Sequence, residues 1–156
     1  MPKLVDTHAH VNFNNFKNDG KKVIDRALKH GIWIINVGAQ YSTSKRAVEY
    51  AKKYKEGVYA VVGLHPSHVF DEELNERKYM ELLENEKVVA VGEIGLEYGE
   101  DITDDKKKKQ KEILFRQLEV AQHANKPIVF HCRKAYDDLI ELLDMFNLGC
   151  ASCPHA

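Results

Sequence analysis

Residues 88–99 read VVAVGEIGLEYG, and this segment is the most informative about the fold. The run from Val88 to Ile94 is apolar at nearly every position and too short for a typical helix. This pattern is typical of a strand in a parallel sheet that is covered on both faces. Glu93 interrupts the run, and a buried carboxylate costs on the order of several kcal/mol unless it is paired, protonated or bound to a cation. The stretch therefore predicts a covered parallel sheet with a charged site at the end of one strand.

Four more apolar, β-branched runs lie along the chain. We predict a buried strand in each of them: Leu4 to Thr7, Ile32 to Val37, Val58 to Leu64 and Pro127 to His131. Segments with helical spacing of their apolar residues separate these runs. Because strand and helix alternate along the whole chain at the length of a βα unit, we expect the α/β class with a parallel sheet.

The predicted helix boundaries follow from turn and cap residues. The first two helices are expected to stop at Gly31 and Gly57, since glycine enters the left-handed conformation at little steric cost. The third is expected to follow a cap at Asp71, and the fourth to run from near Thr103 to about Asn125. A fifth helix follows the last strand.

Composition limits the classes of function. The chain has 156 residues, with 23 Lys and Arg against 24 Asp and Glu, so its net charge of -1 provides no general basic surface for nucleic acid or an acidic membrane. Its apolar runs are far shorter than the roughly 20 residues of a membrane span, and the N-terminus lacks the pattern of a secretory signal. Three cysteines near the C-terminus agree with a reducing compartment. We expect one domain over residues 1–156 and a cytoplasmic location, or a nuclear one in a eukaryotic cell.

Two architectures fit the alternation of strands and helices: a five-stranded doubly wound sheet, which the length favours, and a (β/α)8 barrel, which needs at least ~200 residues. The strand ends favour the barrel, because His8, His10, Glu93 and His131 are all metal-ligand residue types at carboxyl ends of strands. In an open sheet of order 2-1-3-4-5, the first and fifth strands would lie about 14 Å apart. A curled sheet directs such side chains to one centre. The alternatives are two solvent-facing histidines, an ion pair between Glu93 and Arg133, and a core histidine at 131.

Four motifs in this order and spacing resemble the TatD-type metal-dependent deoxyribonucleases of the amidohydrolase superfamily. They are VDTHAH at 5–10, VGLHP at 62–66, VGEIGLEY at 91–98 and KPIVFHCR at 126–133. The resemblance covers essentially the whole chain. It implies a (β/α)8 barrel with a two-metal centre that hydrolyses DNA phosphodiesters, commonly as a 3′ exonuclease.

The resemblance also assigns roles to single residues. His8 and His10 would hold the first metal, Glu93 would contact both, and His131 would hold the second, with Zn, Mg or Mn as the divalent ions. His65 would lie by the scissile phosphate, and our own hypothesis from the chemistry is that His65 and Arg133 orient the phosphate. A further ligand would be His155, near the end of the chain. Glu97 stands where the family usually has aspartate, a change expected to be tolerated because the carboxylate is kept.

The family's metal-binding aspartate at strand eight has no counterpart in these 156 residues. The chain is therefore expected to be the N-terminal part of a barrel, with five βα units and the start of strand six. Unpaired strands at both edges of such a sheet would favour self-association. Two other functions stay open: a hydrolase of the same superfamily acting on another ester or amide, and a non-catalytic chain that binds metal or a partner.

Overall fold

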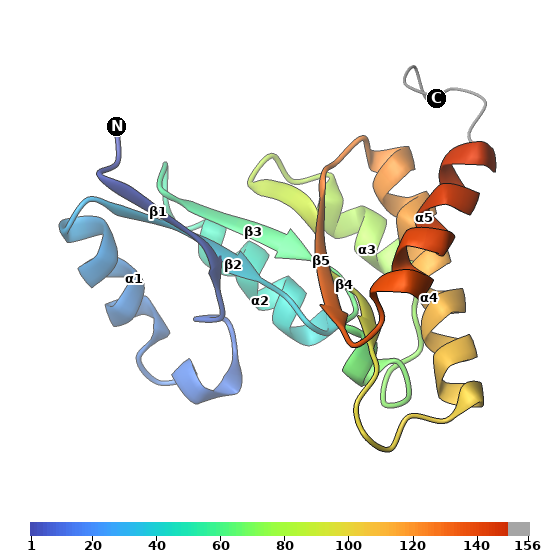
Figure 1. The fold of residues 1–156 in the computed structure, drawn as a ribbon. Coiled ribbons are helices and arrows are strands. Elements are labelled where there is room, and N and C mark those ends of the chain that lie inside the picture. Colours follow the sequence, from blue (N-terminus) through green and yellow to red (C-terminus); the bar gives the residue numbers. More distant parts are fainter. Residues whose placement is uncertain (150–156) are drawn as a thin grey trace.

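The computed structural model describes residues 1–149. Its sheet contains β1 (Leu4–Ala9), β2 (Ile32–Val37), β3 (Val58–Val62), β4 (Val88–Glu97) and β5 (Ile128–Arg133). The strands pair in parallel and in chain order, β1-β2-β3-β4-β5 (Figure 1). A doubly wound sheet with its first strand in the interior is thereby excluded. Sequential order is the order of strands in a (β/α)8 barrel, as the strand-end residues predicted.

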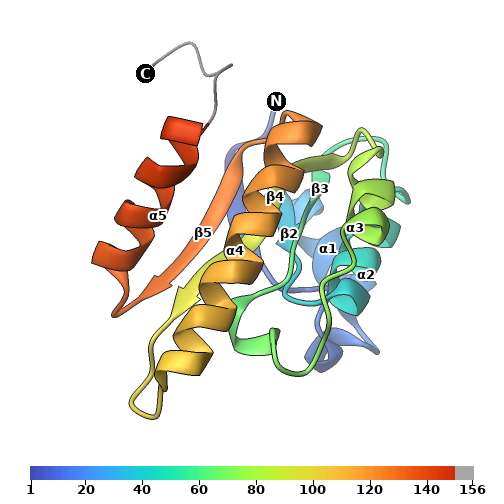
Figure 2. The same ribbon diagram turned by 90° about the vertical axis from the view of Figure 1, so that its right-hand side faces the viewer.

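The helices lie against the outer face of the sheet (Figure 2). They are α1 (Gly20–Lys29), α2 (Tyr41–Ala51), α3 (Glu76–Leu83), α4 (Asp104–Ala124) and α5 (Tyr136–Gly149), with 3₁₀ turns η1 (Asn14–Phe16) and η2 (Pro66–His68). The main apolar core forms between this helical layer and the strands, with Ile24, Leu64, Ile94, Leu114 and Leu118 among its fully buried members. A smaller cluster without helix residues contains Val37, Val61 and Ala90 and forms on the inner face.

Cap residues set the helix ends, with two corrections to the sequence prediction. Thr103 caps α4 by accepting the Lys106 N–H, and α4 ends at Asn125 in the left-handed conformation, as expected. The predicted cap of α3 at Asp71 is wrong, because Asn75 accepts the Lys78 N–H and the helix begins at Glu76. The loop before Asn75 instead belongs to the connection from η2. Likewise α2 ends at Ala51, well before Gly57.

Three strands extend further toward the carboxyl edge than predicted. β1 continues to Ala9, β4 to Glu97 and β5 to Arg133. The extension pairs β4 with β5 up to Glu97 opposite Arg133. Gly95 permits this pairing, because a Cβ atom at that position would overlap the carbonyl oxygen of His131 on β5.

The first strand is not buried, contrary to the expectation for all five runs. Leu4 is 66% exposed and Val5 is 45% exposed. The expectation also fails for β5, whose residues are half-buried or exposed, with Phe130 at 37%. The physical reason is position: within residues 1–149, β1 and β5 lie at the edges of the sheet, and each pairs with one strand, β2 and β4. The helix that follows β1 packs mainly against β2. An apolar, β-branched run thus predicts a strand, but it does not predict whether that strand lies at the edge or in the interior of the sheet.

The fold is a curled half of a (β/α)8 barrel, built from five βα units. The predicted start of strand six falls in residues 150–156, outside the described residues. Within residues 1–149, no helix has both the length and the apolar character needed to cross a bilayer.

Candidate metal centre

Glu93 lies at the middle of a cluster of side chains on the carboxyl edge of the sheet. Its Oε2 atom is 3.2 Å from Nε2 of His8 on β1, and its Oε1 atom is 3.1 Å from Nδ1 of His131 on β5. β1 and β4 are three strand positions apart, which in a flat sheet would separate them by about 14 Å. Curvature of the sheet brings these side chains into contact, and the Glu93 side chain is only 13% exposed.

The first group of ligand-type atoms comes from His8, His10 and Glu93, which all lie within 4.8 Å of one another. Nδ1 of His10 lies 3.0 Å from the carbonyl oxygen of Val37. Because that oxygen can only accept, Nδ1 carries a proton and the Nε2 lone pair is left for a cation. The His10 ring also packs against Phe13, with centroids 4.4 Å apart. This arrangement matches a histidine prepared to bind metal.

The second group contains His65, Glu93 and His131, also within 4.8 Å. His65 differs from the others in its hydrogen bonds, because its Nδ1 accepts the backbone N–H of Ser67 at 3.1 Å. Burial, with a smaller effect of neighbouring His131, lowers the pKa of His65 to about 4. The ring is therefore neutral at physiological pH, with its proton on Nε2. His65 presents an N–H donor to the centre, with Nε2 4.0 Å from Oε1 of Glu93.

Arg133 does not pair with Glu93, so the ion pair considered as an alternative for that carboxylate is wrong. Its Nη1 atom donates to Oε1 of Glu97 at 2.9 Å, and Oε2 of Glu97 lies 2.7 Å from Nε2 of His131. The guanidinium is held at the same rim and is 58% exposed on its side chain. It can reach an anion that approaches from solvent.

The structure thus brings together at one rim all the predicted site residues that it describes. They are His8, His10, His65, Glu93, His131 and Arg133. His155 lies outside the described residues. For the other two alternatives, the His8 side chain is 40% exposed yet contacts Glu93, and the His131 side chain is 23% exposed with a carboxylate at each ring nitrogen.

Sequence reasoning placed Glu97 in a family motif but gave it no role at the rim, and it missed two further residues there, Gln110 and Gln117. Glu97 lies four residues after Glu93 on the same strand, and the alternation of side chains along a strand could have placed both on one face. Two buried glutamines of α4 bond strand ends through their side-chain amides: Gln110 bonds the N–H and C=O of Glu97, and Gln117 bonds those of Leu64. No local pattern marks these glutamines, because their partners are distant in sequence.

The donor set fits divalent transition metals. Imidazole nitrogen and carboxylate oxygen are the ligands of catalytic zinc and related sites, and one carboxylate between two histidine groups suits a bridging position. Such ions would be held by His8, His10, Glu93 and His131, whereas His65 provides a hydrogen-bond donor. This assignment agrees with the roles that the motifs implied.

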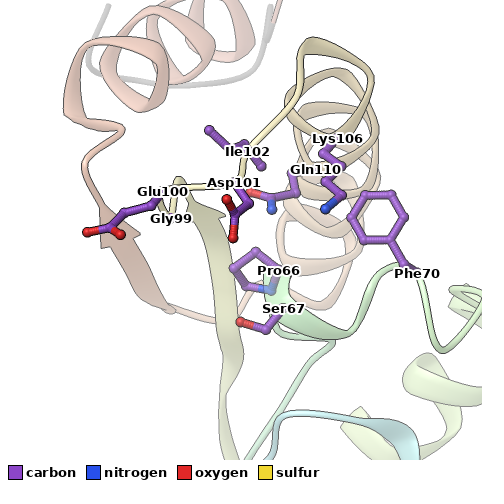
Figure 3. Close-up of a pocket in the computed structure, with 9 residues that line it drawn as sticks. All are labelled: Pro66, Ser67, Phe70, Gly99, Glu100, Asp101, Ile102, Lys106 and Gln110. Carbon is purple, nitrogen blue, oxygen red and sulfur yellow. The ribbon is translucent and has the colours of Figure 1, made fainter.

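A cavity of about 270 Å³ is lined by residues that follow His65 and Glu97 in the chain, and none of the cluster side chains lines it. Figure 3 shows that its lining comes from the turn after β3, the loop after β4 and the beginning of α4, including Pro66, Phe70, Asp101 and Lys106. Pro66 directly follows His65 in the chain. The lining mixes apolar, acidic and basic groups.

Comparisons with known proteins agree with this geometry. The family model described as TatD related DNase matches residues 5–156. An uncharacterized metal-dependent hydrolase of Methanocaldococcus jannaschii is 39% identical over 133 residues, which are 84% of this chain and 51% of the relative. A protein named 3′-5′ ssDNA/RNA exonuclease TatD from Edwardsiella piscicida is 31% identical, over 90% of this chain and 54% of the relative.

A solved structure is similar over nearly the whole chain. The crystal structure of the TatD homologue YjjV of Escherichia coli superposes with a TM-score of 0.78 at 31% identity, covering 94% of this chain and 57% of that protein. The chain spans about half the length of the relatives that it matches. With the strand order, the cluster around Glu93 and the family match in agreement, this chain belongs to the TatD-related DNase family.

Proposed function

We propose that this chain carries the first half of a two-metal centre that hydrolyses phosphodiester bonds of DNA from the 3′ end. One observation carries the proposal: the two oxygens of Glu93 face histidines from different strands, His8 and His131, at 3.2 and 3.1 Å. A single carboxylate between two ligand groups can contact two adjacent cations, as a two-metal site would need. The exonuclease names of some relatives support the choice of substrate.

The proposed metal ligands are His8, His10 and Glu93 for one ion, and Glu93 with His131 for the other. His155 is proposed as a further metal ligand, on the motif alone. When bound, two divalent cations would supply positive charge that neutralises a phosphodiester, activates water and stabilises the leaving oxygen. The ions would be Zn, Mg or Mn, since imidazole and carboxylate bind each of them to a different degree.

The remaining side chains at the rim recognise the anion. His65 is neutral and directs an Nε2–H donor toward the centre, so it can bond a phosphate oxygen without repelling a cation. Arg133 offers guanidinium N–H groups from the exposed side of the same rim. Local donors of this kind replace a general basic surface, which agrees with a net charge of -1.

We further propose that residues 1–156 form one domain. The cytoplasmic location stays a prediction from the sequence.

The test measures metal binding and DNA cleavage together. Glu93→Gln keeps the size of the side chain but removes the charge that both groups share. We expect this variant to lose bound metal, measured by elemental analysis after gel filtration, and to lose release of nucleotides from 3′-labelled single-stranded DNA. Glu76→Gln is the matched control, because Glu76 pairs with Arg116 between α3 and α4, away from the rim.

The outcomes separate the candidate functions. Metal binding with DNA cleavage supports the nuclease. Metal binding without DNA cleavage leads to assays of other esters and amides, and it favours a non-catalytic metal-binding chain if these are inert too. Metal retention by Glu93→Gln at the level of the unchanged chain would refute the central role of Glu93.

A further inference from the structure

We propose that Glu97 is the positioning residue of this centre: its carboxylate fixes the ring of His131 and holds Arg133 at the same rim. The inference rests on the proposed function, because it takes His131 as a metal ligand. It concerns a residue whose side chain lies outside the ligand groups described above. The argument starts from the two ring nitrogens of His131.

The imidazole of His131 lies between two carboxylates. Nδ1 is 3.1 Å from Oε1 of Glu93, and Nε2 is 2.7 Å from Oε2 of Glu97. Only one ring nitrogen can bind a cation at the shared cluster, and the other is then free to donate its proton. The nitrogen that faces Glu93, the carboxylate shared by both ligand groups, is Nδ1. Glu97 therefore accepts the Nε2–H, which fixes the tautomer with its lone pair on Nδ1.

The second oxygen of Glu97 is also used. Oε1 accepts from Nη1 of Arg133 at 2.9 Å, so the carboxylate joins an imidazole and a guanidinium from the same strand. Residues 131 and 133 lie two apart on β5 and point to the same side. Cross-strand pairing places Glu97 opposite Arg133. One carboxylate thus sets the distance between a metal ligand and the proposed phosphate-binding cation.

Glu97 is itself held in place. The buried side chain of Gln110 on α4 accepts the Glu97 N–H at 2.8 Å and donates to its carbonyl oxygen at 3.1 Å. The Glu97 side chain is 17% exposed, so solvent competes little for its oxygens. A carboxylate with a fixed backbone and two charge-assisted partners has little freedom to rotate. This rigidity is what a positioning role needs.

The first experiment uses the metal-free chain and the variant Glu97→Gln. The Arg133 guanidinium can only donate, so it takes the amide oxygen of the variant, and the amide NH₂ then faces Nε2 of His131. We expect the proton of the ring to move to Nδ1, where Glu93 accepts it. Long-range ¹H–¹⁵N NMR of histidine-labelled protein at about pH 8.5, well above the ordinary histidine pKa, reports the change. Nε2 of His131 should be protonated in the unchanged chain and unprotonated in the variant.

The second experiment measures Zn²⁺ affinity by competition with a chelating dye. Glu97→Gln should weaken one of the two binding events about 10-fold to 100-fold, the usual effect of removing a carboxylate behind a ligating histidine. The other event, at His8 and His10, should not change. Glu97→Asp should restore both the affinity and the protonated Nε2, because it keeps the carboxylate. Glu76→Gln, which neutralises a different ion-paired glutamate, should leave both events unchanged.

The results distinguish this inference from the proposed function. If the unchanged chain binds two zinc ions and Glu97→Gln binds them equally well, Glu97 has no positioning role while the metal centre stands. An unprotonated Nε2 of His131 in the unchanged metal-free chain would also overturn the inference. Failure of the unchanged chain to bind zinc would refute the proposed metal centre, and with it the role assigned to Glu97.

Discussion

At the scale of single residues, the second ring nitrogen of each histidine decides what the first can do. In His10 a backbone carbonyl takes the Nδ1 proton and leaves Nε2 for a cation. In His65 the opposite holds, because a backbone N–H occupies the Nδ1 lone pair and the proton is on Nε2. Two histidines at one rim are therefore prepared for different tasks, one as a ligand and the other as a donor.

The contrast gives a prediction for His65. His65→Ala should keep the zinc stoichiometry of the unchanged chain, because His65 is a hydrogen-bond donor and does not bind a metal ion. Cleavage of single-stranded DNA should fall about 10-fold to 100-fold, as expected for the loss of one hydrogen bond to a charged group. Elemental analysis and a nucleotide-release assay measure the two effects. Loss of a zinc equivalent in His65→Ala would show instead that His65 is a ligand.

At the scale of elements, α4 holds the rim through its two buried glutamines. Gln110 and Gln117 lie seven residues apart and so on one face of the helix. Each bonds both backbone groups of one residue: Glu97 at the end of β4, and Leu64 two residues after the end of β3. Gln110 fixes Glu97, and Gln117 fixes Leu64, the neighbour of His65. Each side-chain amide takes the place of a neighbouring strand, because it bonds backbone N–H and C=O groups that would otherwise have no partner.

Removal of one amide tests this role. Gln117→Met fills a similar volume but leaves the buried N–H and C=O of Leu64 without these partners. The free energy of unfolding should fall by about 2 to 6 kcal/mol, at roughly 1 to 3 kcal/mol for each of the two unsatisfied groups. Urea unfolding of the metal-free chain gives the value. Glu119→Gln, at an exposed position of the same helix, should change stability by less than about 0.5 kcal/mol. A Gln117→Met variant as stable as this control would contradict the role.

At the scale of the whole molecule, the sheet has two open edges. β1 pairs only with β2, and β5 pairs only with β4 among the described strands. Apolar side chains are exposed along both edges, including Leu4, Val5 and Phe130. Such edges offer unpaired backbone groups and apolar surface to another chain. Self-association of residues 1–156 follows as a prediction.

Sedimentation velocity over a range of protein concentrations measures this association. The average sedimentation coefficient should rise with concentration. Val5→Lys should lower the association, because a charged side chain on an edge strand opposes pairing with a second chain. Glu119→Gln again serves as the control on an outer helix. A chain that stays monomeric at every concentration would exclude edge pairing as the consequence of a half barrel.

Much of the fold could be predicted from the sequence because its signals are local. Alternating apolar runs and helical segments specify the α/β class, and Thr103 and Asn125 mark the ends of α4 through their own backbone preferences. The sequence predictions were wrong where the burial of a strand or the start of a helix depends on contacts with distant parts of the chain. β1 is apolar in sequence yet exposed at an edge, and Asp71 is a good cap residue that no helix follows directly.

The sequence by itself determined which chemistry is available: histidines at 8, 10, 65 and 131, and carboxylates at 93 and 97, all near strand ends. Only the tertiary structure decided how these groups are used. Curvature of the sheet brings His8 to Glu93, and packing of α4 against β4 fixes Glu97 between His131 and Arg133. Hydrogen bonds determine which ring nitrogen carries the proton and which group pairs with each charge. These bonds join segments that are far apart in the sequence, so no local sequence pattern can predict them.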